Sequence, residues 1–67
     1  MKWIVISEFT TDKGTMNSYE EAFIDVAEAL AFYDMQVERY EELKKLAKWK
    51  YAKVVLKLEH KAMYKLI

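Results

Sequence analysis

Residues 2–9 form the strongest strand signal in the chain, and a strand cannot stand alone. They read Lys-Trp-Ile-Val-Ile-Ser-Glu-Phe and are rich in the β-branched and aromatic residues that favour strands. An isolated strand leaves its backbone N–H and C=O groups unpaired. This strand therefore needs a second strand, which must come from elsewhere in the chain, from a second copy or from another protein.

A helix is expected from Tyr19, after a loop at residues 10–18 that contains the only glycine. Ser18 and Glu21 have the spacing of a capping box, in which each side chain pairs with a backbone N–H of the other residue. Apolar residues then recur at steps of three and four, which is typical of an amphipathic helix. The pattern becomes ambiguous near residue 34, where a break in the helix is expected.

The C-terminal third of the chain fits two secondary structures. Apolar and mostly charged side chains alternate over residues 53–59, which indicates a strand. Apolar residues also recur at helical spacing from Tyr51 to Leu66, and this longer pattern favours a helix. A strand at about 52–60, however, would give the strand at 2–9 a partner within the chain.

The expected fold is therefore α+β and predominantly helical, in a single domain over residues 1–67. It consists of an N-terminal strand at about 2–9, a capped acidic helix from residue 19 and a basic C-terminal helix or strand. A domain of this size buries only about 60% of its unfolded surface, so association with a partner would add needed stability.

Charge is divided sharply along the chain, although the net charge is zero. Residues 1–42 contain ten acidic and three basic side chains, whereas residues 43–67 contain eight lysines and one acidic residue. The two halves can complement helix dipoles, pair with each other within the chain or across a dimer, or bind an external anion. On a helix, four lysines would form a stripe in which each neighbouring pair repels by about 0.2–0.5 kcal/mol, namely Lys53, Lys57, Lys61 and Lys65. Such a stripe favours an anionic partner.

Several chemistries are excluded by composition. The absence of cysteine removes disulfides and thiol chemistry, and a single histidine, His60, removes the common paired-histidine zinc sites. One glycine cannot build a phosphate-binding loop. We therefore expect no enzyme activity, no catalytic or metal site and no cofactor. The N-terminal apolar run is too short for a signal peptide or a membrane span, so a cytoplasmic protein without membrane contact is expected.

The function expected is that of a non-catalytic regulator or inhibitor that binds another protein or a second copy of itself. In its aromatic-rich, cysteine-free composition the chain resembles short phage or mobile-element proteins that inhibit host machinery, a likeness that covers no motif and implies a viral host-interaction role. The protein-binding candidates are Trp3, Val5, Phe9, Phe32, Tyr40 and Trp49.

Two other functions remain open. Lysines interleaved with aromatic residues can bind a nucleic-acid backbone and stack bases, and the chain can also be a structural subunit of a larger assembly. The candidates for binding nucleic acid or an acidic partner are Lys50, Lys53, Lys57, Lys61, Lys65 and Tyr64.

Overall fold

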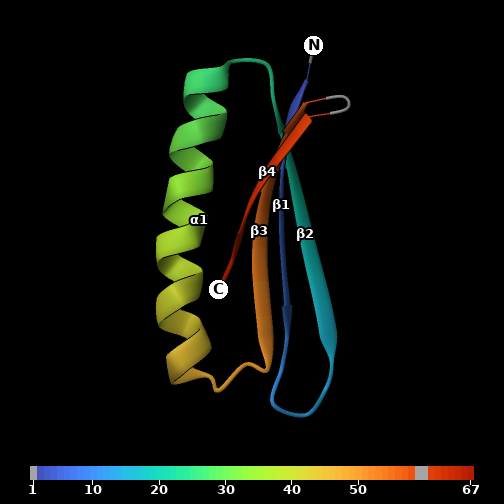
Figure 1. Cartoon of the computed structure of the whole chain (residues 1–67), viewed down its shortest axis with the longest axis vertical. Helices are drawn as coiled ribbons and strands as arrows, with labels where there is room; N and C mark the ends of the chain where they lie inside the picture. Colours follow the sequence, from blue (N-terminus) through green and yellow to red (C-terminus); the bar gives the residue numbers. More distant parts are fainter. Residues whose placement is uncertain (1, 59–60) are drawn as a thin grey trace.

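The computed structural model describes residues 2–58 and 61–67. Four strands form one antiparallel sheet, and a helix lies across one face of it (Figure 1). In chain order the elements are β1 (Trp3–Thr10), β2 (Met16–Phe23), α1 (Val26–Leu46), β3 (Tyr51–Leu58) and β4 (Lys61–Leu66). In this described part of the chain, strands hold more residues than the helix. The prediction of a predominantly helical fold is therefore wrong.

The sheet has the strand order β2-β1-β3-β4. The strand expected at residues 2–9 is present as β1, and it pairs antiparallel with β2 on one side and β3 on the other. Because both neighbours run antiparallel to β1, they run parallel to each other, and α1 is the crossover that connects them. The strand alternative for about 52–60 thus supplies the partner that β1 requires, as β3 over residues 51–58, while residues 59 and 60 lie outside the described part of the chain.

The predicted helix start at Tyr19 is wrong, because Ser18, Tyr19 and Glu21 belong to β2. Every residue of β2 is paired with β1, from Met16 opposite Thr10 to Phe23 opposite Trp3. This pairing supplies more backbone hydrogen bonds than a capping box, which satisfies two donors. The loop before β2 is a shorter turn than expected, and it contains Gly14 at φ 88°, a conformation that favours glycine.

Helix α1 begins at Val26 and is capped by Asp25, whose carboxylate accepts a 2.9 Å hydrogen bond from the backbone N–H of Ala27. It continues without the break expected near residue 34, since the buried residues at 29, 33, 36 and 40 form one continuous stripe against the sheet. The helix ends where Lys48 adopts a left-handed φ of 55°. Glycine is the usual residue at this position. Because a lysine occupies it here, no signal in the sequence marks the end of the helix.

The C-terminal third is a pair of strands, and the prediction that favoured a helix is wrong. Ala52, Val54 and Leu56 of β3 are buried beneath α1, and the residues between them face the opposite side of the sheet. β4 pairs antiparallel with β3 at the edge of the sheet. His60 lies outside the described residues.

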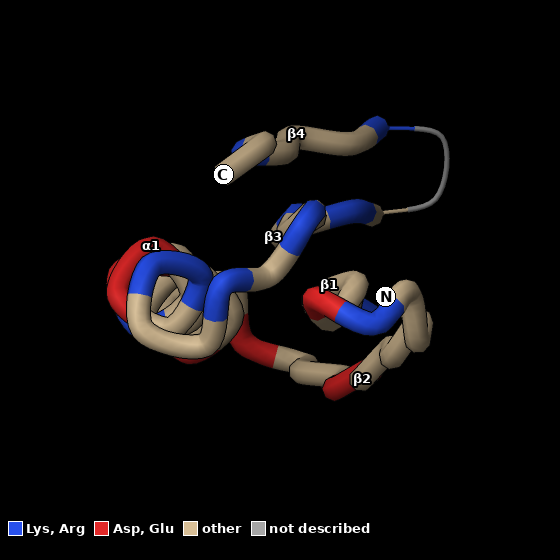
Figure 2. The backbone as a smooth tube through the Cα atoms, turned by 90° about the horizontal axis from the view of Figure 1, so that it is seen from below, with Lys and Arg blue, Asp and Glu red and all other residues tan. Residues whose placement is uncertain are grey.

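The hydrophobic core lies entirely between α1 and one face of the sheet. The helix packs mainly on β3 and β1, while β2 and β4 lie to either side (Figure 2). The opposite face of the sheet is covered by no element among the described residues. The buried apolar side chains are Val5, Ala29, Tyr33, Tyr40, Ala52, Val54 and Leu56.

Strand geometry also corrects the expected lysine stripe. Lys53 and Lys57 alternate with the buried residues of β3 and therefore face away from α1. Lys65 is paired with Val54 on the α1 side of the sheet, and Lys61, four residues earlier in β4, faces the same way. The lysines are thus divided between the two faces.

Candidate binding site in an aromatic hollow

An aromatic hollow of about 420 Å³ lies between α1, the end of β1 and the neighbouring strand β2. Its walls come from four separate parts of the chain, which meet only because α1 crosses from β2 to β3. The lining residues are Phe9, Tyr19, Phe32, Gln36, Arg39, Tyr40, Leu43 and Trp49.

Three rings form one wall of the hollow. Phe9 and Trp49 are stacked with ring centroids 3.9 Å apart and planes 13° apart. Tyr40 meets both rings edge-on, at 5.8 Å from Phe9 and 5.2 Å from Trp49. Such pairs contribute about 0.5–1.5 kcal/mol each beyond their burial, so this wall is held in place by its own contacts.

The opposite wall is built on Phe32 of α1. Its ring lies 5.3 Å from that of Phe23 and 6.5 Å from that of Tyr19, both on β2. The Tyr19 hydroxyl donates a hydrogen bond to the Glu21 carboxylate, which raises the pKa of Tyr19 through that bond and through its negative charge. Tyr19 itself remains exposed, so it can contact a partner.

Two polar side chains, Gln36 and Arg39, also line the hollow. Gln36 is buried, and its Nε2 donates a 3.0 Å hydrogen bond to the Ser7 hydroxyl. Burial raises the pKa of Tyr40, while the nearby Ser7 hydroxyl and the charge of Arg39 partly offset that effect. The Gln36 Oε1 atom is also buried, but it has no hydrogen-bond partner among the residues that the structure describes. A buried, unpaired carbonyl oxygen is costly, and it marks a place where a donor would be stabilised.

The structure brings four of the six predicted protein-binding residues together in this hollow, namely Phe9, Phe32, Tyr40 and Trp49. Val5 is different, because its exposed fraction is 0% and it can serve only the core. The sixth candidate, Trp3, lies in a separate apolar groove.

Sequence reasoning missed four of the lining residues, namely Tyr19, Gln36, Arg39 and Leu43. Tyr19 was assigned to a helix, where it would have faced another direction. Gln36 carried a usable signal, because it lies three residues after Tyr33 and four before Tyr40 on the apolar side of the helix. Arg39 was considered only for its position in the acidic half of the chain.

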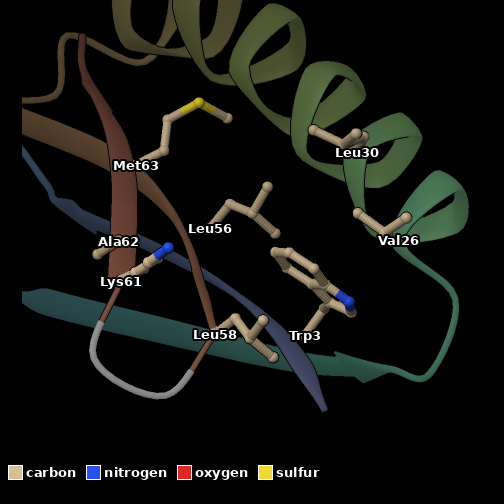
Figure 3. A pocket seen from close by; sticks show the side chains of 8 residues that line it. All are labelled: Trp3, Val26, Leu30, Leu56, Leu58, Lys61, Ala62 and Met63. Atoms are coloured by element: carbon tan, nitrogen blue, oxygen red, sulfur yellow. The ribbon is translucent and has the colours of Figure 1, made fainter. Parts of the chain in front are cut away.

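Trp3 lies in an apolar groove on the other side of α1 (Figure 3). The groove has a volume of about 330 Å³ and separates the first turns of α1 from β4. Farther along α1, Lys44 Nζ donates a 2.6 Å hydrogen bond to the backbone oxygen of Ile67. The labelled residues are Trp3, Val26, Leu30, Leu56, Leu58, Lys61, Ala62 and Met63.

The residues predicted to bind nucleic acid or an acidic partner do not form one site. Lys53 lies 5.0 Å from the ring centroid of Tyr64, a cation–π contact on the sheet face that points away from α1. Lys61 lines the apolar groove on the opposite side. Lys50 precedes β3, and its backbone N–H donates to Thr10.

Among the residues that the structure describes, no helix is both long enough and apolar enough to cross a membrane. Comparison of the chain with protein families, with curated proteins and with solved structures finds no match.

Proposed function

We propose that this protein is a non-catalytic regulator or inhibitor that binds another protein through the aromatic hollow. The observation that carries the proposal is the unpaired Oε1 of Gln36, a residue that lines the hollow together with aromatic side chains. Binding sites combine apolar walls with a few well-placed polar groups, and their volumes run from about 300 to 1,000 Å³. The hollow has both properties.

The chemistry of the hollow indicates which side chain it receives. Aromatic walls favour an aromatic ring, and the free carbonyl oxygen favours a ring that carries a donor. Tyrosine and tryptophan meet both conditions and are enriched among the residues that dominate protein interfaces. Arg39 at the same hollow can pair with a carboxylate. The expected partner therefore presents a tyrosine or tryptophan beside an acidic residue.

Capped peptides that differ in one hydroxyl group test this proposal. We compare Glu-Tyr-Glu with Glu-Phe-Glu by following Trp49 fluorescence in a Trp3→Phe background, so that a single indole reports. A hydrogen bond to the unpaired carbonyl contributes about 1–1.5 kcal/mol, so the tyrosine peptide should bind about tenfold more tightly. Gln36→Leu should remove this preference while leaving the weaker binding of the phenylalanine peptide.

The charged part of the site has its own matched control. Arg39→Gln should weaken binding of the acidic peptide, and raising the salt concentration should produce a similar loss. Glu38→Gln changes a neighbouring exposed side chain and should have little effect. Equal binding of the two peptides, or a tyrosine preference that survives Gln36→Leu, would show that the hollow does not recognise a donor-bearing ring.

A further inference from the structure

The face of the sheet that points away from α1 has a regular arrangement of charge. Apolar side chains, among them Ile6 and Val55, occupy its middle, and Tyr64 and Leu66 are exposed on β4 at 63% and 58%. We call this surface the open face. Its residues are Ile4, Ile6, Glu8 and Thr10 of β1, Met16, Ser18, Glu20 and Ala22 of β2, Tyr51, Lys53, Val55 and Lys57 of β3, and Ala62, Tyr64 and Leu66 of β4.

The open face is large enough to hold a second copy of the chain. Four strands spaced about 4.8 Å apart and about eight residues long cover roughly 500 Å². Two copies would thus bury roughly 1,000 Å², which is about the minimum for a specific interface. The chain also exposes 4864 Å², whereas a compact protein of its mass, 8.0 kDa, exposes about 4,450 Å². This excess is consistent with a face that is covered in the assembled protein.

The strand register places the charges of the open face in rows that cross the sheet. Glu8 on β1 lies directly beside Lys53 on β3. Each of the two makes a different contact within the chain. Glu8 accepts a 3.1 Å hydrogen bond from the Tyr51 hydroxyl, and Lys53 Nζ lies over the ring of Tyr64. The middle row begins with Glu20 on β2, while Lys53 and Lys57 lie on β3, so the open face is acidic toward β2 and basic toward β3.

Two arrangements are possible when identical sheets stack face to face with aligned strands. With the two-fold axis parallel to the strands, β1 of one copy faces β3 of the other and each row faces itself. Glu8 of each copy then faces Lys53 of the other, and Ile6 of each copy faces Val55 of the other.

With the axis perpendicular to the strands, β2 of one copy faces β2 of the other, and Glu20 faces Glu20 of the second copy. Lys53 then faces Lys57, and like charges oppose each other.

We propose that the protein forms a two-fold dimer through the open face, with the axis parallel to the strands and Glu8 paired with Lys53 across the interface. A second copy is the occupant because the face is complementary to itself in this arrangement alone. The aromatic hollow lies on the other side of the sheet, so dimerisation leaves it free and does not depend on the proposed function.

Mixing two charge variants tests this arrangement. Glu8→Lys and Lys53→Glu each place like charges together twice, so each variant should self-associate about tenfold more weakly, as measured by sedimentation equilibrium. A mixture of the two restores attraction at both contacts and should form a heterodimer, which native mass spectrometry identifies by its mass. A salt bridge within one chain cannot produce this rescue, because each variant still carries two like charges.

Two further variants keep the result interpretable. Ile6→Lys places a charge in the middle of the interface and should give a monomer, with far-ultraviolet circular dichroism confirming that the fold persists. Glu38→Lys makes the same change in charge as Glu8→Lys on the exposed side of α1 and should leave the dimer intact. If Ile6→Lys does not fold, the mixing experiment decides by itself.

Three results would overturn the proposal. The first is a protein that stays monomeric at every concentration tested. This result would include a monomer that binds a random RNA oligonucleotide and loses that binding in Lys53→Glu. The second is a mixture that forms no heterodimer. The third is tighter self-association of Lys53→Glu, which is the result expected of the axis perpendicular to the strands, where residue 53 faces Lys57.

Discussion

Replacing Gln36 with leucine should stabilise the protein although it removes a buried hydrogen bond. The bond from Gln36 Nε2 to Ser7, at 3.0 Å, contributes about 1 kcal/mol. The unpaired Gln36 Oε1 costs about 1–3 kcal/mol because it is buried away from water. Leucine and glutamine have similar helix propensities, so the helix itself adds little to the difference. The net change should be a gain of about 1 kcal/mol in the free energy of unfolding.

Urea denaturation measures this gain, at one fixed protein concentration because dimerisation would otherwise change the apparent stability. In thermal unfolding, about 1 kcal/mol should raise the Tm of a domain of this size by about 4–8 °C. The same substitution should abolish the tyrosine preference of the hollow. Gln36 would then be a residue that is kept for binding at a cost in stability.

Ser7→Ala completes a double-mutant cycle around the same hydrogen bond. Alone, it leaves Gln36 Nε2 without its partner and should cost about 1–2 kcal/mol. In the Gln36→Leu background that hydrogen bond is already absent, so the cost should be smaller. If Gln36→Leu destabilises the protein by more than about 1 kcal/mol, the carbonyl oxygen has a partner such as a buried water, and the argument for a free acceptor fails.

Three other predictions follow from burial, capping and titration. Val54→Ala removes a fully buried side chain and should cost about 2 kcal/mol in urea denaturation, whereas Val26→Ala at a 41% exposed position should cost less than about 1 kcal/mol. Asp25→Ala removes the helix cap and should cost about 1 kcal/mol, with Asp25→Asn retaining most of the stability; equal losses would rule out capping. Burial raises the pKa of Tyr33 and Tyr40 above the ordinary value of 10.0, so the folded state retains protons that the unfolded state releases. The resulting stability should be complete below about pH 10 and be lost as the pH rises through the folded pKa, and a urea midpoint that does not fall there would contradict it.

The position of β1 was predictable because its residues favour a strand whichever neighbour they acquire. The start of α1 was also signalled locally, since Asp25 is a good cap followed by a run of helix-forming residues. Ser18 and Glu21 offered an equally good cap seven residues earlier. Only pairing with β1 decided between the two starts, because it took residues 16–23 into the sheet.

The candidate site was partly predictable for the same reason. Large aromatic residues such as Phe9, Tyr40 and Trp49 are expected at cores and interfaces, but their convergence in one hollow depends on the crossover of α1. The free acceptor of Gln36 is a property of the packed structure, since no sequence pattern shows which buried polar groups lack a partner.

By itself, the sequence determined the strand at the N-terminus, the turn at Gly14, the division of charge and the lack of cysteine and paired-histidine chemistry. Tertiary structure alone decided that residues 51–58 and 61–66 are strands and that the lysines are divided between two faces. The physical reason is that an apolar residue every second or every fourth position suits either a strand or a helix over a short segment. The unpaired backbone of β1 settles the choice, because a strand beside it satisfies hydrogen bonds that a helix would leave unmade.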